Sequence, residues 1–558
     1  MFFFNTLSGK FWASTAYHNN TSFQPIPVSP LTTQENNNTT IAKSAGVVGL
    51  AVMFSRILGL VREQVFAALF GAGYAGDAFI VAFRIPNLLR DLFGEGALSA
   101  AFVAVFSDYE SNRSKEETRL LACNVLCFFA ILLSIVSLLG CIFAEQIVNV
   151  LAPDFSLVAG KTALTVWLTR IMLPFLICIS LAAVVMGMLN TRGRFFVPAL
   201  ASSFFNLGSI VCGGGLALVL PRYGYPAIVG MAIGTLCGGF LQFAIQLPSL
   251  YRTGFRFTPQ LRLRDPGLLR IVKLMGPATI GLSAVQLNIF INTNFASSCA
   301  EGSVSWLNYA FRLVQLPIGI FGVALSIAMM PVLAKQAAKK NISAMRSTLI
   351  SSLLMVLALT IPATAGLLLL AEEIIRLIFE QGAFTSKDTI ATAATLSCYA
   401  VGLFAYSANK VMVPAFYAIN KPSYPVVASF LAVLLNIIFI RLTIDSFQHL
   451  AIAASTSATM VINFIFLLTI LSNKTGGLPL GYLFRGLIKI VAATAVLVAV
   501  VLGCLEMLGG FFAATKPLQL CALLLTISLA VVVYGAFLHL VKLKEAQQLT
   551  SKILSYLR

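Results

Sequence analysis

Charged residues are scarce in this chain. Of its 558 residues only 10% are Asp, Glu, Lys or Arg, whereas 58% are hydrophobic. Because soluble domains carry about 25% charged residues, this composition argues against a soluble globular enzyme. Apolar runs of the roughly 20 residues needed to cross a bilayer recur from residue 45 to the C-terminus. We therefore predict a polytopic membrane protein.

Clustered metal ligands are also missing from the sequence. The three histidines, His18, His449 and His539, lie far apart, and the ten cysteines are scattered through apolar runs. A metal site needs several such ligands together, so we predict no metal site. We also predict no disulfide framework, and we interpret the cysteines as small core side chains.

Fourteen apolar segments are candidate membrane spans. Backbone groups in lipid must be hydrogen-bonded internally, and runs such as "LLMVLALTIPATAGLLLL" lack the alternation of a barrel strand. We therefore predict an all-α polytopic membrane protein with about fourteen transmembrane helices. The expected spans are 45–70, 77–106, 120–143, 162–189, 197–220, 225–248, 274–297, 303–334, 347–371, 389–418, 423–440, 450–471, 484–507 and 517–541.

The net charge of +18 would suggest a nucleic-acid partner in a soluble protein. Its placement indicates membrane topology instead. With the N-terminus inside, the tails and alternate loops hold 25 Lys and Arg, whereas the other loops hold 6. Cytoplasmic loops carry such an excess. We therefore predict that both termini are cytoplasmic and that no nucleic acid is bound.

Short words recur at a nearly constant spacing of 227 to 230 residues. The matched pairs are "AFRI" at 82–85 with "AFRL" at 310–313, "ALS" at 97–99 with 324–326, Asn190 with Asn420, Pro198 with Pro425, and Asn206 with Asn436. A shift by this number of residues aligns spans 1 to 6 with spans 7 to 12, and the two sets cross the membrane in the same orientation. It predicts two pseudo-symmetric six-helix lobes around a central cavity, as in many secondary transporters.

Four regions follow from this repeat. Residues 1–43, rich in Asn, Thr and Pro, are expected to form a disordered cytoplasmic extension. Residues 44–250 form the expected N-lobe, with spans 1 to 6. Residues 251–472 form the expected C-lobe, which begins with a basic cytoplasmic loop. Residues 473–558 hold the last two helices and a cytoplasmic tail.

Several ionisable residues fall inside the expected spans, where each costs about 2.5–3.5 kcal/mol at a helix centre. The basic ones are Arg56, Arg62, Arg84, Arg90, Arg170, Arg312 and Lys410. For Arg170 and Lys410 we favour a side chain that reaches the membrane surface. In spans 1, 2 and 8 arginines outnumber carboxylates even when Glu63 and Asp91 are counted. Forked guanidinium donors suit phosphate, so we predict a cavity for an anionic, phosphate-bearing cargo.

Four segments carry a recognisable pattern. They are "SRILGLVREQVFAALFGAGYAGDAFIVAFRIPNLLRDLFGEGALSAAFVAVF" (55–106), "GSVSWLNYAFRLVQLPIGIFGVALSIAMMPVLAK" (302–335), "FEQGAFTSKDT" (379–389) and "NKPSYPVV" (420–427). Their sequence closely resembles the MurJ (MviN-type) lipid II flippases of the multidrug/oligosaccharidyl-lipid/polysaccharide exporter superfamily. The resemblance implies fourteen helices, in two six-helix lobes plus two more.

The resemblance also implies which residues bind the cargo. The substrate-binding residues would be Arg56, Arg62, Arg90 and Arg312. Of these, Arg62, Arg90 and Arg312 would grip a diphosphate, and the last two helices would form a groove for the polyprenyl tail. Asp77 and Glu95, which the resemblance implies, are expected supporting cavity or gate residues, and we add Arg84, Pro86, Asn87 and Gln315 to this group. No catalytic residue is expected.

Two departures from the family pattern affect these expectations. Phe311 and Gln315 stand where some members have carboxylates beside the span-8 arginine. The sodium site of some members would fall on Asn292 and Asn436, and Ile440 stands at the candidate carboxylate position one helical turn on from Asn436. We therefore expect no cofactor and no sodium site, with the membrane potential or an ion gradient as driving force.

The expected function is a lipid II flippase of the bacterial cytoplasmic (inner) membrane. It would move undecaprenyl-diphosphate-linked disaccharide-pentapeptide from the inner to the outer leaflet by alternating access. Its partners would be lipid II and membrane lipids, with cell-wall synthesis proteins as further candidates. Two alternatives stay open, a related exporter of another lipid-linked saccharide and a membrane enzyme that uses the carboxylates of 372–388.

Overall fold

The computed structural model describes residues 32–93, 96–512 and 514–547. Every secondary-structure element assigned in these residues is a helix. The chain separates into two units, residues 1–50 and 51–558. Of the first unit only residues 32–50 are described, as the beginning of α1. Residues 1–31 of the expected extension lie outside the described residues, and α1 already begins at Thr32.

The second unit consists of two helical halves followed by a hairpin of two long helices. The first half comprises α1 (Thr32–Phe70, here from Ala51), α2 (Tyr74–Phe93), α3 (Ala97–Asn112), α4 (Lys115–Ile142), α5 (Ala144–Leu151), η1 (Pro153–Leu157), α6 (Lys161–Met172), α7 (Phe175–Thr191), α8 (Phe196–Gly208), η2 (Ser209–Gly214), α9 (Gly215–Val219), η3 (Leu220–Tyr223), α10 (Ile228–Ala244) and α11 (Leu247–Tyr251). The second half comprises α12 (Pro266–Ser297), α13 (Ser303–Pro317), η4 (Ile318–Val323), α14 (Ala324–Ala338), α15 (Ile342–Leu369), α16 (Ala371–Phe379), α17 (Ser386–Val401), α18 (Leu403–Ala418), α19 (Ser423–Phe447) and α20 (His449–Thr475). The hairpin is α21 (Leu480–Phe512) and α22 (Lys516–Leu540).

Eleven of the fourteen expected spans are long and apolar enough to cross a membrane in the described part of the chain. Ten are single runs, and the eleventh is α17 with α18, bent by 42°. The other three expected spans correspond to α1, to α2 with α3, and to α12, which are helical but fall outside this group. These three helices carry the ionisable and amide side chains of the expected site. The prediction of an all-α membrane protein is confirmed.

The internal repeat is visible in equivalent elements of the two halves. A short amphipathic helix follows the long helix in each half, α5 after α4 and α16 after α15. Asn206 of α8 donates to the Ser55 carbonyl of α1 at 3.1 Å. Its counterpart Asn436 of α19 donates to two side chains of α12, the helix equivalent to α1. The predicted repeat is therefore confirmed in element order and in the contacts of matched residues.

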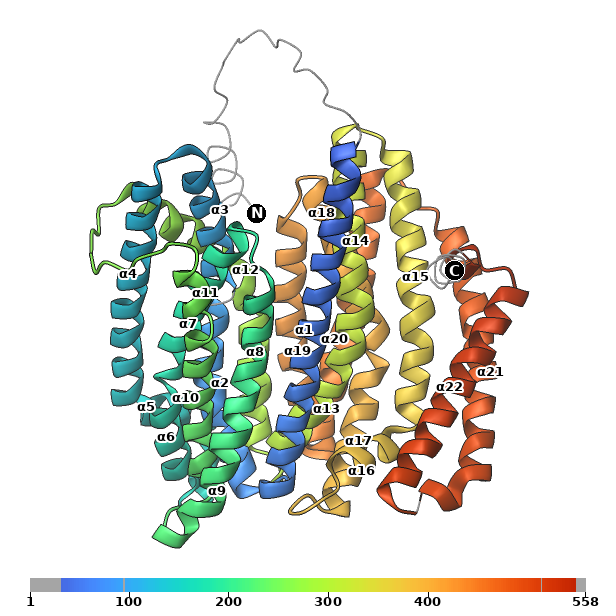
Figure 1. Cartoon of the computed structure of the whole chain (residues 1–558). Helices are drawn as coiled ribbons and strands as arrows, with labels where there is room; N and C mark the ends of the chain where they lie inside the picture. Colours follow the sequence, from blue (N-terminus) through green and yellow to red (C-terminus); the bar gives the residue numbers. More distant parts are fainter. Residues whose placement is uncertain (1–31, 94–95, 513, 548–558) are drawn as a thin grey trace. The chain divides into compact units, whose positions relative to one another are not determined.

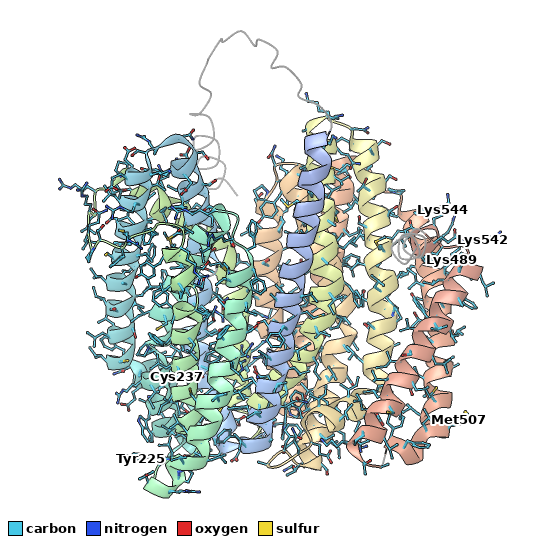
Figure 2. The ribbon with its side chains drawn as sticks, viewed as in Figure 1. Tyr225, Cys237, Lys489, Met507, Lys542 and Lys544 are labelled. Carbon is cyan, nitrogen blue, oxygen red and sulfur yellow. The ribbon has the colours of Figure 1, made fainter. Side chains whose placement is uncertain are left out.

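Basic residues gather at one end of the helices. We name the two ends the Gly71 end, where α1 stops, and the Arg113 end, where α3 stops (Figure 1). The turns of the Arg113 end hold Arg113, Arg192, Arg194, Arg252, Arg256, Arg262, Arg264, Lys339, Lys340 and Lys421. Figure 2 shows Lys489, Lys542 and Lys544 at this end of the α21–α22 hairpin, with Met507 toward the other end. The charge asymmetry expected from the sequence is thus present in the arrangement of the turns.

The two halves meet tightly at the Gly71 end. The Ala383 amide donates to the Ala68 carbonyl at 2.8 Å. Gly71 and Gly382 flank this contact, both with φ of +60°, and a Cβ on either would lie within 2.4 Å of a backbone oxygen of the other turn. Only glycine fits such positions. Phe66 and Val81 of the first half share one apolar core with Phe379 of the second, so this end is closed by packing as well as by hydrogen bonds.

Candidate functional site

Glu63 joins two of the predicted substrate arginines. Its Oε1 accepts from Arg62 Nη2 at 2.7 Å and lies 3.1 Å from Arg312 Nη2. Arg62 and Glu63 are on α1 and Arg312 is on α13, so the carboxylate links the two halves. The Glu63 side chain is 8% exposed, whereas that of Arg312 is 39% exposed. Two guanidinium groups on one carboxylate leave a positive charge that is not neutralised within the trio.

Arg90 has its own carboxylate neighbour. Its Nε and Nη2 both donate to Asp91 Oδ1, at 3.2 and 2.9 Å. The other Asp91 oxygen accepts from Gln286 Nε2 of α12 at 3.0 Å, which ties this pair to the second half. Arg62 lies within electrostatic range of both Arg312 and Arg90. The structure therefore brings together three of the four predicted substrate arginines.

Arg84 extends this basic cluster, and neither Arg84 nor Arg56 has an ion pair in the described part of the chain. Arg84 Nη2 donates weakly to Asn308 of α13, at 3.4 Å. Arg84 is also within electrostatic range of Arg312. Arg56 is exposed, and its Nη1 would lie 2.9 Å from a Cβ on Gly319 of η4. The arginines Arg62, Arg84, Arg90 and Arg312 thus outnumber the carboxylates Glu63 and Asp91 by two.

Asp77 is a buried carboxylate that bonds to residues of both halves. Its side chain is 2% exposed and accepts from Lys161 Nζ at 3.1 Å. It also accepts from the Gly302 amide at 2.9 Å and from the Ser305 amide and hydroxyl, at 3.0 and 2.7 Å. The first amides of a helix have no partners within the helix. Asp77 of α2 therefore caps α13 at the Gly71 end.

The capping is reciprocal, because each half also supplies a carboxylate that caps a helix of the other half. Glu301, just before α13, accepts from the amide of Tyr74, the first residue of α2, at 2.9 Å. Asp77 and Ser305 stand 228 residues apart, at equivalent places in the repeat. Each of the two equivalent helices thus receives a carboxylate from the other half, where the helix dipole favours negative charge.

The remaining predicted residues form none of the ion pairs or helix caps described above. Glu95 lies outside the described residues. Pro86 is buried within α2, which runs through it as one helix, and Asn87 is half-buried on the same helix. Gln315 is exposed and lines a polar cavity. Arg170, interpreted as a surface residue, is exposed, and its Nε donates to the Cys141 carbonyl.

Sequence reasoning missed Lys161, Glu301, Ser305 and Gln286. Each of them meets its partner only in the folded chain, and no local sequence pattern identifies it. Only Ser305 had a signal, because the repeat spacing aligns it with Asp77. Glu63 was noted only as a neighbour that neutralises Arg62 and not as a link to the other half.

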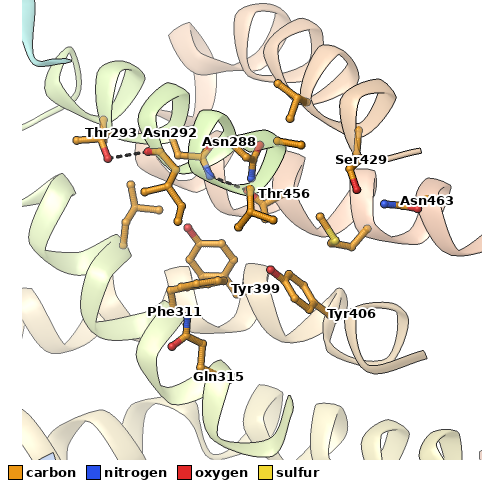
Figure 3. Close-up of a pocket in the computed structure, with 18 of the residues that line it drawn as sticks. Asn288, Asn292, Thr293, Phe311, Gln315, Tyr399, Tyr406, Ser429, Thr456 and Asn463 are labelled. Atoms are coloured by element: carbon orange, nitrogen blue, oxygen red, sulfur yellow. Dashed lines mark hydrogen bonds between the residues drawn. The ribbon is translucent and has the colours of Figure 1, made fainter. Parts of the chain in front are cut away.

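A polar cavity of about 170 Å³ lies within the second half, with one side chain from the first. Arg84 is the only charged side chain among the described residues that line it. The uncharged lining side chains include Asn288, Asn292, Thr293, Gln315, Tyr399, Tyr406, Ser429, Thr456 and Asn463. Figure 3 shows the rings of Tyr399 and Tyr406 across the cavity from the amides of Asn288 and Asn292.

The amides beside this cavity are hydrogen-bonded to one another. Asn436 directs its Nδ2 to Asn288 Oδ1 at 2.9 Å and to Asn292 Oδ1 at 2.7 Å. These two hydrogen bonds join α19 to α12. No carboxylate lines the cavity among the described residues, and no three His, Cys, Asp or Glu side chains come together in that part of the chain.

An apolar groove of about 890 Å³ lies between α21 of the hairpin and the helices α15, α17, α18 and α20 of the second half. Its walls are Leu357, Ile361, Thr364 and Leu368 of α15, Val401, Phe404, Phe464 and Leu468 of the neighbouring helices, and Leu480, Gly481, Leu483, Phe484 and Leu487 of α21. A single hydroxyl, that of Thr364, is present among these side chains. Such a surface suits a hydrocarbon chain.

Comparison with known proteins settles the family. A family model described as "Lipid II flippase MurJ" matches residues 66–547. A probable lipid II flippase MurJ of Buchnera aphidicola subsp. Acyrthosiphon pisum is 35% identical over 467 residues, which is 83% of this chain and 90% of that protein. This chain belongs to the lipid II flippase MurJ family. It is therefore a transporter and not an enzyme, and it is a multi-pass membrane protein.

Other relatives agree with this assignment. The Vibrio cholerae protein is 34% identical over 76% of this chain and 82% of its own length. A solved structure titled "Lipid II flippase MurJ, inward closed conformation" is 30% identical, covers 88% of this chain and 98% of its own, and has a TM-score of 0.73. An inward-facing multidrug resistance MATE family transporter of the MOP superfamily shares the fold at 16% identity, over 77% of this chain and 98% of its own, with a TM-score of 0.60.

We expect Asp77→Asn to destabilise the protein by about 3–5 kcal/mol, because it leaves the buried Lys161 ammonium without its counter-ion. The unfolding temperature of the purified protein measures this. In a second variant, Asp77→Asn with Lys161→Met, the buried cation is gone and part of the loss should return. An equal or larger loss in the double variant would show that the ion pair is not the source.

Proposed function

We propose that this chain is a lipid II flippase that holds the diphosphate of its cargo with Arg62, Arg90 and Arg312. The observation that supports it most is the surplus of guanidinium groups where α1, α2 and α13 meet. Arginine forms forked, charge-assisted hydrogen bonds with phosphate oxygens. The cargo is undecaprenyl-diphosphate-linked disaccharide-pentapeptide, and Arg56 and Arg84 add to the attraction.

In this proposal Glu63 is the anionic partner of Arg62 and Arg312 while no cargo is bound. Without cargo it reduces the repulsion between Arg62 and Arg312, 2.7 and 3.1 Å away. An arriving diphosphate competes with Glu63 for Arg312, the more exposed of the two arginines. Moving a bare diphosphate through hydrocarbon would be very costly, whereas a polar basic path replaces much of its hydration.

Alternating access fits a molecule whose halves are fastened by buried hydrogen bonds at the Gly71 end. Loops rich in Lys and Arg face the cytoplasm, so we assign the Arg113 end to the cytoplasm and the Gly71 end to the outer face of the bacterial inner membrane. Both chain termini then lie inside. In this state the reciprocal caps of Asp77 and Glu301 hold the outer end shut. Outward opening requires their release, and the polyprenyl tail stays in the apolar groove beside α21.

The proposal is tested by complementation of bacteria depleted of their own precursor flippase. Arg90→Ala and Arg312→Ala should fail to rescue growth, and lipid II should accumulate in the inner leaflet. Arg170→Ala is the matched control, because this exposed arginine of α6 donates to the Cys141 carbonyl and takes no part in the arginine cluster. It should rescue like the parent chain.

Two outcomes would contradict the proposal. A parent chain that inserts well but does not rescue would point to another lipid-linked saccharide as cargo. Full rescue by Arg90→Ala and Arg312→Ala, at equal membrane levels, would keep the cargo and reject the phosphate site.

We further propose that the membrane potential drives transport without sodium. A potential negative inside favours outward movement of negative charge by about 2.3 kcal/mol per charge per 100 mV. In vesicles at fixed pH, collapsing the potential should stop flipping, and replacing sodium with choline should leave it unchanged. Flipping that needs sodium but not the potential would reject this driving force.

A further inference from the structure

We propose that the polar cavity of the second half is a saccharide subsite, which binds the first sugar of the cargo next to its diphosphate. This inference rests on the proposed function, because it takes the cargo to be a glycosylated diphosphate lipid. It adds a second recognition element, made of uncharged side chains, to the arginine cluster.

The lining chemistry matches a neutral, hydroxyl-rich ligand. Amides and hydroxyls each offer hydrogen-bond donors and acceptors, and the cavity presents three asparagines, one glutamine, two tyrosines, one serine and two threonines. The rings of Phe311, Tyr399 and Tyr406 add flat apolar surface for the C–H face of a sugar ring. The volume of about 170 Å³ greatly exceeds the ~30 Å³ of one liquid water, and it suits one ring-sized group better than two.

The cavity also lies in the right place. Gln315, which lines it, follows Arg312 by three residues on α13, so the two side chains are neighbours on one helix face. Arg84 lines the same cavity and is within electrostatic range of Arg312. In a sugar diphosphate the first sugar is bonded directly to phosphate. A phosphate held at Arg312 therefore places that sugar at the Gln315 side of the cavity.

Two lining side chains have buried polar atoms that lack a partner among the described residues. They are Asn463 Oδ1 and Arg84 Nε. Leaving such groups unpaired costs about 1–3 kcal/mol each. A sugar hydroxyl can donate to the amide oxygen and accept from the guanidinium. The only charge on the lining described is the positive one of Arg84, which disfavours a cation as the occupant.

The test compares three lipids on the purified full chain in nanodiscs. They are undecaprenyl diphosphate without sugar, the same lipid with one sugar, and the disaccharide-pentapeptide form. Asn463→Leu and Tyr406→Phe should weaken binding of both glycosylated lipids by about 5- to 30-fold and leave binding of the sugarless lipid unchanged. Thr469→Val, on the same helix as Asn463 but exposed and outside the cavity lining, is the control and should change nothing.

The outcomes separate this inference from the proposed function. Equal weakening of all three lipids, or of none, would overturn the saccharide subsite. If the parent chain binds the sugarless lipid and Arg312→Ala does not weaken that binding, the phosphate site of the proposed function fails. Stabilisation of the parent chain by sodium over choline, abolished by Asn463→Leu, would make the cavity a cation site and overturn the subsite.

Discussion

One oxygen of Glu63 holds two arginines from different halves of the molecule. This shared contact accounts for how a surplus of positive charge can persist inside a chain that is otherwise built for lipid. A buried guanidinium without a counter-ion is expensive, so some carboxylate must be near. A single carboxylate for two guanidiniums stabilises the cluster and still leaves it attractive to an anion. Under the proposed function, Arg312, the more exposed partner, is the one that a diphosphate would reach first.

The two ends of the molecule are then held in different ways. At the Gly71 end the halves are joined by short hydrogen bonds between helix ends, by two glycine turns in close approach and by a shared apolar core. At the Arg113 end basic loops dominate. Breaking the reciprocal caps exposes the first amides of α2 and α13 together, since each helix is capped from the other half. Closure at the Gly71 end is thus cooperative.

Much of the architecture was predictable from the sequence. Apolar runs, their spacing and the repeat predicted a helical membrane protein of two equivalent halves, and arginines inside spans indicated the basic cluster. The contacts within the cluster were not predictable, because Lys161, Glu301 and Gln286 meet their partners only after folding. Asp77 illustrates the limit. Its position at a span end was visible, but its burial and its role as a cap for α13 depend on how the halves pack.

The amide network shows a different limit. The residues Asn292 and Asn436 were identified from the sequence, but their mutual hydrogen bond was not. Asn288, one turn before Asn292, also accepts from Asn436, and the sequence did not single it out. The lining of the neighbouring cavity comes from α12, α13, α17, α18, α19 and α20, far apart in sequence, together with Arg84 of α2.

The central claim is that Glu63 competes with a diphosphate for the arginines, and binding to the Glu63→Gln variant tests it most directly. This substitution keeps the size of the side chain and removes its charge. We predict that the purified variant binds undecaprenyl diphosphate several-fold more tightly than the parent chain at low salt, because the competitor is gone. Weaker or unchanged binding by a well-folded variant would contradict the account and make Glu63 a structural support instead.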